Sequence, residues 1–192
     1  SPCPSGTSPA TFPHREDLCG VVAYWQLGSE LDSVIGNYHL TSDSDTELQL
    51  GRFSDEEGAS VFHDGSEVKS STISAAPQLK DDDLAVELWY FIRPNHLSGG
   101  YLMGLPVSPT ENVLELHVAE NGDIEWTIST SGNTVTLTAS GGVERWVHVA
   151  LNYDGAKAVL FVDGYAQDGT PLTGTFKNSS LPMYIGSSGP LE

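Results

Sequence analysis

Two carboxylates, Asp123 and Glu125, have a spacing in this chain that could support catalysis. They are separated by one residue in a segment that alternates apolar and polar positions, so they share one face of a predicted strand. Neighbouring carboxylates can divide nucleophile and acid duties in glycoside hydrolysis. Polar positions on the solvated face of a half-buried strand are the commoner origin of such a pair. We therefore assign no catalytic residue from the sequence.

The histidines and tryptophans indicate structural roles. His148 lies inside a strand pattern with no nucleophile near it in the sequence, so we expect a structural histidine within the core. The other five histidines lack the spacing that makes a zinc site persuasive. The four tryptophans also lie in predicted strands, at Trp25, Trp89, Trp126 and Trp146. For most of them we expect packing in the core and not a platform for a glycan.

The charge balance excludes some partners. The chain has 26 acidic and 8 basic residues, which gives a formal net charge of −18. Such a surface repels the phosphate backbone of a nucleic acid and an anionic membrane. The same excess suits a divalent cation, and it also suits a surface charged for solubility. Charge alone does not separate these two interpretations.

The cysteines favour an extracellular location. Cys3 and Cys19 are the only cysteines, and their pairing would close a loop in an N-terminal segment, residues 1–17, that holds four prolines. Asn178 begins the only N-glycosylation sequon, Asn-Ser-Ser. No apolar stretch approaches the length of a membrane span. We expect a secreted protein or an ectodomain with a disulfide-pinned leader at 1–20, one domain at 21–188 and a tail at 189–192.

The hydropathy pattern predicts an all-β protein. Alternation appears at residues 21–27, 113–118, 134–138 and 146–153, with short apolar islands at 48–50 and 60–62. The run at 84–92 predicts a strand that is buried on both faces at the centre of a sheet. Asn121-Gly122, Asp154-Gly155 and Asp163-Gly164 are typical of turns between antiparallel strands. No segment has the periodicity of an amphipathic helix.

These segments together resemble a known family. The sequence WVHVA at 146–150, then LFVDG at 160–164 and YIG at 184–186, is similar to the C-terminal half of laminin G-like and pentraxin-like domains of the concanavalin A-like lectin/glucanase superfamily. VAYW at 22–25 and VELW at 86–89 are similar to the first half. The resemblance implies a two-sheet antiparallel jelly-roll sandwich whose function resides on its loops or its concave face.

The resemblance implies a non-catalytic adhesion or recognition module of a larger secreted or cell-surface protein, which binds a protein or glycan ligand. The alternative is a glycoside hydrolase or lyase with a degenerate acidic motif, because related glucanases place a further acid where this chain has Asn121. A purely structural spacer is a third hypothesis. Pentraxin-like relatives often assemble, so a homo-oligomer is compatible with the sequence.

The resemblance also implies a Ca²⁺ site at the rim of the sandwich. Many relatives use an aspartate in the loop after the first strand, and Asp32 matches that position. Asn37 lies in the same loop, and Asp64 precedes a turn that could approach it. Hard oxygen ligands are what Ca²⁺ requires, with carbonyls and water completing the shell. Acidic turn residues that cap their own backbone are the alternative.

Overall fold

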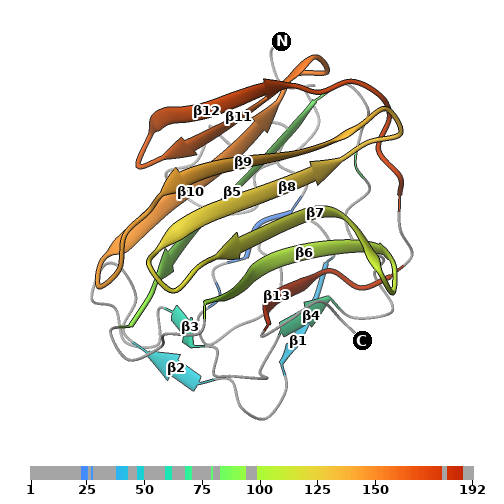
Figure 1. Ribbon diagram of the computed structural model, residues 1–192. Helices are drawn as coiled ribbons and strands as arrows, with labels where there is room; N and C mark the ends of the chain where they lie inside the picture. Colours follow the sequence, from blue (N-terminus) through green and yellow to red (C-terminus); the bar gives the residue numbers. More distant parts are fainter. Residues whose placement is uncertain are drawn as a thin grey trace, which may run out of the picture.

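The computed structural model describes residues 23–25, 27, 38–42, 47–49, 59–61, 68–70, 79, 83–93, 99–178 and 181–187. The regular secondary structure of these residues consists of β-strands (Figure 1). The strands are β1 (Leu40–Ser42), β2 (Glu47–Gln49), β3 (Ala59–Val61), β4 (Val68–Ser70), β5 (Leu84–Phe91), β6 (Gly100–Ser108), β7 (Glu111–Val118), β8 (Asp123–Ser129), β9 (Thr134–Ser140), β10 (Trp146–Tyr153), β11 (Lys157–Val162), β12 (Tyr165–Pro171) and β13 (Tyr184–Ser187). Within these residues no helix could span a membrane.

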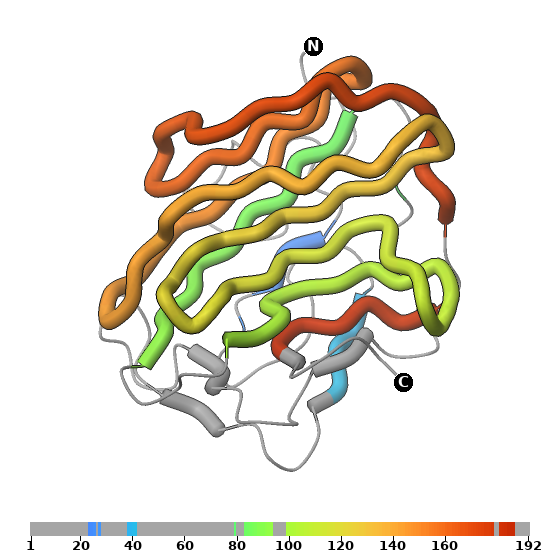
Figure 2. The backbone as a smooth tube through the Cα atoms, in the orientation of Figure 1, coloured from blue at the N-terminus to red at the C-terminus, as the bar shows by residue number. Residues whose placement is uncertain are grey.

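Two antiparallel sheets form the sandwich. The larger has seven strands in the order β1-β4-β13-β6-β7-β8-β9, and the smaller has four in the order β12-β11-β10-β5. β2 and β3 form a separate pair. In Figures 1 and 2 the strands β5 and β10 pass behind β8 and β9, so the two sheets lie face to face. The predicted all-β jelly-roll sandwich is therefore confirmed.

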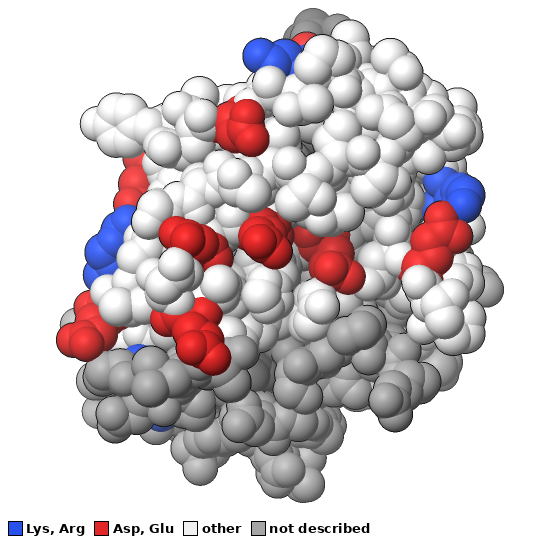
Figure 3. All heavy atoms as spheres, in the orientation of Figure 1, with Lys and Arg blue, Asp and Glu red and all other residues white. Residues whose placement is uncertain are grey.

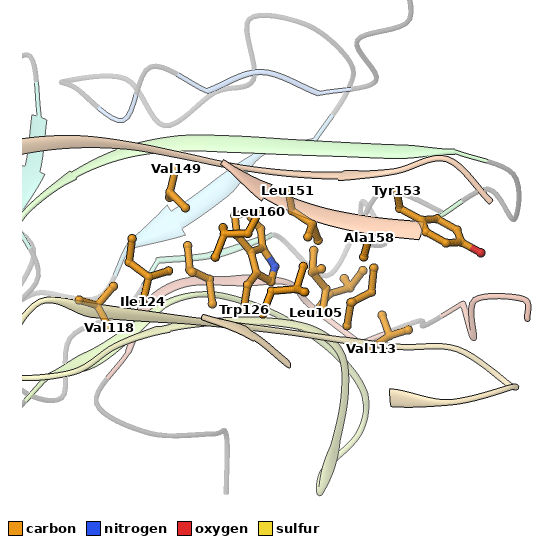
Figure 4. Packing of buried hydrophobic residues seen from close by; sticks show 14 of the residues in the cluster. Leu105, Val113, Val118, Ile124, Trp126, Val149, Leu151, Tyr153, Ala158 and Leu160 are labelled. Atoms are coloured by element: carbon orange, nitrogen blue, oxygen red, sulfur yellow. The ribbon is translucent and has the colours of Figure 1, made fainter. Parts of the chain in front are cut away.

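The core lies between the sheets because each long strand turns every second side chain inward. β8 contributes Ile124, Trp126 and Ile128, all fully buried. The predicted inward series of β10 is also confirmed, since Val147, Val149, Leu151 and Tyr153 are buried. Figure 4 shows the Trp126 ring of the larger sheet beside Leu151 and Leu160 of the smaller sheet.

The predicted turns connect these strands. The β7–β8 hairpin turns at Gly122, whose φ of 83° is readily adopted by glycine, and its N–H donates to the carbonyl of Ala119 over 2.9 Å. Asp163 and Gly164 have φ of 51° and 83°, the pattern of a two-residue hairpin turn with both φ positive. The sequence correctly predicted both hairpins because their turn residues are conformationally specific.

Residues 84–91 form the predicted strand, β5, but the prediction that it is buried on both faces at the centre of a sheet was wrong. β5 stands at the end of the order of the smaller sheet, and its side chains alternate between more and less buried positions. Its outward side chains include Trp89 and Phe91, which are 44% and 42% exposed. Aromatic residues at outward positions extended the apolar run and gave it the appearance of a strand buried on both sides.

The expectations for the tryptophans and His148 hold only in part. Trp126 is in the core, and Trp25 packs against it. Trp146 and His148 occupy outward positions of β10, where both side chains are half-buried. His148 is therefore not a core histidine. The alternation of β10 requires this, since Val147 and Val149 take the inward positions.

The buried hydroxyl of Tyr90 has no hydrogen-bond partner. The Tyr90 side chain is buried, and its hydroxyl lies against Gly141, where an added Cβ would come within 2.1 Å of the oxygen. Burial is the main cause that raises the pKa of this phenol; the positive charge of Arg145 lowers it, and the negative charge of Asp163 raises it. The fold thus favours the neutral phenol and leaves its hydrogen-bonding capacity unused.

We predict that Tyr90→Phe leaves the free energy of unfolding unchanged or raises it by up to about 1 kcal/mol, because it removes a buried unpaired group. The pKa of Tyr90 is higher in the folded protein than in the unfolded chain. The stability that follows from this difference is therefore complete below about pH 10 and is lost as pH rises further. The variant should therefore lose less stability above about pH 10. Urea unfolding at pH 7 and pH 11 measures both effects. Tyr165→Phe is the control because its ring is 74% exposed; a destabilised Tyr90→Phe would contradict the prediction.

Candidate functional site

A row of three polar side chains crosses the outer face of the larger sheet. Tyr101 of β6 stands opposite His117 of β7, and His117 stands opposite Glu125 of β8. We call these three residues the polar row. The inward neighbours Leu116, Val118 and Ile124 are buried in the core. Strand alternation therefore holds the three polar side chains together on the solvent side.

The members of the polar row contact one another. The rings of Tyr101 and His117 have centroids 5.0 Å apart and are tilted by 55°. Nδ1 of His117 lies 3.7 Å from a carboxylate oxygen of Glu125. The imidazole therefore has an aromatic ring on one side and a carboxylate on the other.

A fourth polar residue, Glu115, is held beside the row. It lies two positions before His117 on β7, and its carboxylate accepts a hydrogen bond from the side-chain amide of Asn112. The same amide nitrogen is 3.3 Å from the Tyr184 hydroxyl. The Tyr184 ring lies across Gly104, where an added Cβ would come within 1.9 Å of the ring. Glycine at 104 thus makes room for the ring whose hydroxyl contacts Asn112.

Hydroxyl groups continue this face on the side of β9. The hydroxyls of Thr127 and Thr136 are 2.8 Å apart, and those of Ser129 and Thr134 are 2.9 Å apart. Figure 3 looks onto this face and shows acidic side chains across its middle, with basic side chains towards its edges. The surface is therefore acidic and rich in hydrogen-bonding oxygen atoms.

The carboxylates act electrostatically on Tyr101. Partial burial is the main reason that the pKa of this phenol is raised, and the negative charges of Glu115 and Glu125 raise it further. Each carboxylate disfavours the phenolate form. Tyr101 is therefore a neutral hydrogen-bond donor, beside two groups that accept hydrogen bonds when ionised.

This arrangement can bind a ligand that carries many hydroxyl groups. Glu115 and Glu125 can accept hydrogen bonds from ligand hydroxyls, and such charge-assisted bonds are stronger than neutral ones. The Tyr101 ring offers an apolar surface with a polar end, and His117 can donate or accept according to its tautomer. A sugar presents both hydroxyls and C–H faces, so it meets both kinds of group.

The same face does not prepare Asp123 and Glu125 for catalysis. Asn121 holds Asp123 in the hairpin turn, donating to its carboxylate over 2.7 Å and accepting from its backbone N–H over 3.0 Å. Glu125 faces His117 instead. Both carboxylates are exposed, and their side chains have different partners.

The predicted metal ligands and disulfide lie outside the described residues; these are Asp32, Asn37, Asp64, Cys3 and Cys19. Among the residues that are described, no group of three or more His, Cys, Asp or Glu side chains could hold a metal ion.

The sequon residue Asn178 is described and exposed. Its side-chain oxygen accepts a hydrogen bond from the backbone N–H of Leu79 over 2.8 Å. The bond engages the side-chain oxygen and not the amide nitrogen, which is the atom that N-glycosylation modifies. Glycosylation of Asn178 stays a prediction.

Sequence reasoning did not identify the polar row. One pair in it had a usable signal, because a hairpin that turns at Asn121-Gly122 places His117 opposite Glu125. Tyr101 had no such signal, since the pairing of β6 with β7 shifts register between Tyr101 and Met103. A register shift of this kind changes which side chains meet and leaves no mark in the hydropathy pattern.

Comparison with protein families identifies the fold's relationships. A family model described as the concanavalin A-like lectin/glucanases superfamily matches residues 64–190, well over half of the chain. This chain belongs to that superfamily. The resemblance predicted from the strand sequences is confirmed. Comparison with curated protein sequences gives no match.

Solved structures of the same fold include binding domains of larger proteins. The receptor-binding domain of botulinum neurotoxin type G is 12% identical with a TM-score of 0.61, covering 86% of this chain and 42% of that one. The binding domain of botulinum neurotoxin DC is 10% identical with a TM-score of 0.60, covering 88% and 44%. Domain 4 of the arabinanase AbnA from Geobacillus stearothermophilus is 12% identical with a TM-score of 0.58, covering 87% and 85%. This chain therefore spans less than half the length of the two neurotoxin binding domains.

We predict that Glu115→Gln and Glu125→Gln each lower the pKa of Tyr101, because each removes a negative charge that opposes the phenolate. The pKa should stay above the ordinary tyrosine value, since burial is the main cause of its rise. Titration of the Tyr101 ring carbon by NMR measures the change. Glu144→Gln, at an exposed loop position before β10, is the matched control. An unchanged Tyr101 pKa in both variants would show that the carboxylates do not act on the phenol.

Proposed function

We propose that this chain is a non-catalytic recognition module that binds a glycan on the outer face of the larger sheet. The observation that carries the proposal is the polar row, in which Tyr101, His117 and Glu125 adjoin one another on three neighbouring strands. Glu115 and the hydroxyls of Thr127 and Thr136 extend the set of hydrogen-bonding groups. Rigid strands hold these groups in place, which lowers the entropy cost of binding.

The related structures support this proposal. Domain 4 of AbnA was solved in complex with arabinotriose, and the binding domain of neurotoxin DC in complex with SialylT. The fold they share with this chain therefore serves as a binding module inside larger proteins. We propose the same arrangement here, with the larger protein secreted or displayed at the cell surface.

An extracellular location is supported by Cys3, Cys19 and the sequon at Asn178. Asn178 is exposed, as a glycosylated asparagine must be. Intact mass of the secreted protein, measured with and without reductant and glycosidase, tests this part of the proposal. Free thiols and an unmodified Asn178 would count against it.

We predict that a glycan array identifies a ligand and that Tyr101→Ala weakens its binding by about tenfold, because the ring supplies both the apolar contact and a donor. Glu125→Gln should weaken binding by a smaller factor, since its amide keeps one acceptor oxygen. Calorimetry with the best glycan measures both changes. Tyr165→Ala and Glu144→Gln are the matched controls, because both residues are exposed and lie outside the polar face.

Three outcomes would overturn the proposal. An array without any signal at micromolar protein would favour a spacer. Unchanged glycan binding in Tyr101→Ala and Glu125→Gln would place the site elsewhere. Release of reducing ends from β-glucan or glycosaminoglycan, lost in Asp123→Ala or Glu125→Ala, would make the protein a glycoside hydrolase or lyase.

We also propose that Ca²⁺ binds at Asp32, Asn37 and Asp64, supported by the net charge of −18 and the oxygen ligands these residues offer. Added Ca²⁺ should raise the melting temperature of chelator-treated protein by mass action, and Asp32→Ala should abolish the rise. Calorimetry measures the binding directly. Absence of heat and of a melting shift at millimolar Ca²⁺ would exclude the site.

A further inference from the structure

Four aromatic rings form a cluster on the outer face of the smaller sheet, on the opposite side of the sandwich from the polar row. Phe91 of β5 stands opposite Trp146 of β10, and Trp89 stands opposite His148. The ring centroids are 5.7 Å apart in the first pair and 4.8 Å apart in the second. We call these four residues the aromatic plate.

The core does not need these rings. The inward positions of the same strands are filled by Leu88 and Tyr90 on β5 and by Val147 and Val149 on β10. Trp89 and Phe91 remain 44% and 42% exposed, and they are two of the four large hydrophobic residues exposed in the described part of the chain. Ala150 of β10 and Phe161 of β11, opposite each other in register, continue the apolar surface. A contiguous exposed apolar surface of this kind indicates a binding surface.

The outward positions of the other sheet give a contrast within the same molecule. On β9 these positions hold Thr134, Thr136 and Thr138, which are exposed and suit a strand in contact with water. The outward positions of β5 and β10 could have held similar residues without loss of the core. Folding alone therefore does not explain why they hold aromatic residues.

The charges around the plate favour a cationic ligand. Glu87 precedes Trp89 by two positions on β5, its side chain is 75% exposed, and its carboxylate lies 3.2 Å from Nε2 of His148. At the other side, Asp163 pairs with the nearby Arg145 over 2.7 Å and accepts from the backbone N–H of His148 over 3.0 Å. The positive charge of Arg145 is thus offset, and Glu87 leaves the rim anionic.

We propose that the aromatic plate binds a basic segment of another protein, with a lysine or arginine side chain over the rings of Trp89 and Phe91. The faces of aromatic rings attract cations, and an arginine guanidinium also stacks on them. Glu87 supplies a counter-charge beside them. The net charge of −18 attracts such a partner over a distance and repels both a second copy of this chain and an anionic membrane. This surface is separate from the proposed glycan site.

The test uses an eight-residue peptide with arginine at alternate positions, and a second peptide in which citrulline replaces each arginine. The arginine peptide should bind, and the citrulline peptide, which has the same shape without the charge, should bind about tenfold more weakly. In the wild-type protein, NMR should show that the arginine peptide shifts the indole signals of Trp89 and Trp146 and not that of the buried Trp126. This measurement does not depend on any variant.

Variants then locate the site. Trp89→Ala and Phe91→Ala should each weaken binding of the arginine peptide by about tenfold, and Glu87→Gln should weaken it by a smaller factor. Tyr101→Ala and Glu125→Gln, on the opposite face, should leave peptide binding unchanged. They are also the variants that should weaken glycan binding, so failure of one proposal is distinguishable from failure of the other. Melting temperatures confirm that each variant folds.

The proposal fails if the arginine peptide does not shift the wild-type indole signals of Trp89 and Trp146. It also fails if Trp89→Ala and Phe91→Ala bind the arginine peptide as tightly as wild type does, because binding would then be due to the net charge. It also fails if light scattering shows a dimer that Trp89→Ala dissociates, which would make the plate an interface between copies. Loss of glycan binding in Trp89→Ala with peptide binding kept would assign the plate to a glycan instead.

Discussion

One core shared by two sheets is the constraint on which the rest of this structure depends. Each long strand must place alternate side chains between the sheets, where Trp126 and Leu151 are fully buried (Figure 4). The intervening positions then face water whatever residue they hold. The outer surfaces of both sheets follow from this alternation. The polar row on β6 to β8 and the aromatic plate on β5 and β10 lie opposite the inward positions that form the core.

The two outer faces obey the same geometry but differ in chemistry. The larger sheet presents Glu115, Glu125 and several threonines, whose hydrogen-bonding groups are compatible with water and with a hydroxylated ligand. The smaller sheet presents Trp89 and Phe91, and the exposure of these rings to water does not stabilise the fold. The residue types at these outward positions do not affect the core. Binding can therefore decide which residues occupy them. The difference between the faces is therefore more informative about function than the fold is.

The sequence predicted the hairpins well because turn residues act locally. Asn121-Gly122 and Asp163-Gly164 need only their own backbone angles, so they are readable from the chain alone. The strand β5 was misjudged because an exposed aromatic residue has the same hydropathy as a buried one. The polar row required knowledge of the register between β6 and β7, which shifts beside Tyr101. Sequence reasoning thus reached the architecture and missed the contacts that depend on pairing between strands.

A chain of contacts at one end of the sandwich links the two sheets. Asp163 accepts from the backbone N–H of His148 and pairs with Arg145, and these two contacts, in that order, lower the pKa of its carboxyl group. Arg145 in turn donates to the carbonyl of Gly141.

The chain continues into the larger sheet, where the Gly141 N–H donates to the carbonyl of Gly122 over 2.9 Å, in the turn of the β7–β8 hairpin. A turn of the smaller sheet is thereby joined to a turn of the larger one through Arg145 and the backbone of Gly141. Because hydrophobic packing is not directional, this polar connection supplies orientation that the apolar core between the sheets does not. It connects a strand of the aromatic plate with the hairpin that carries part of the polar row, although the two surfaces face opposite ways.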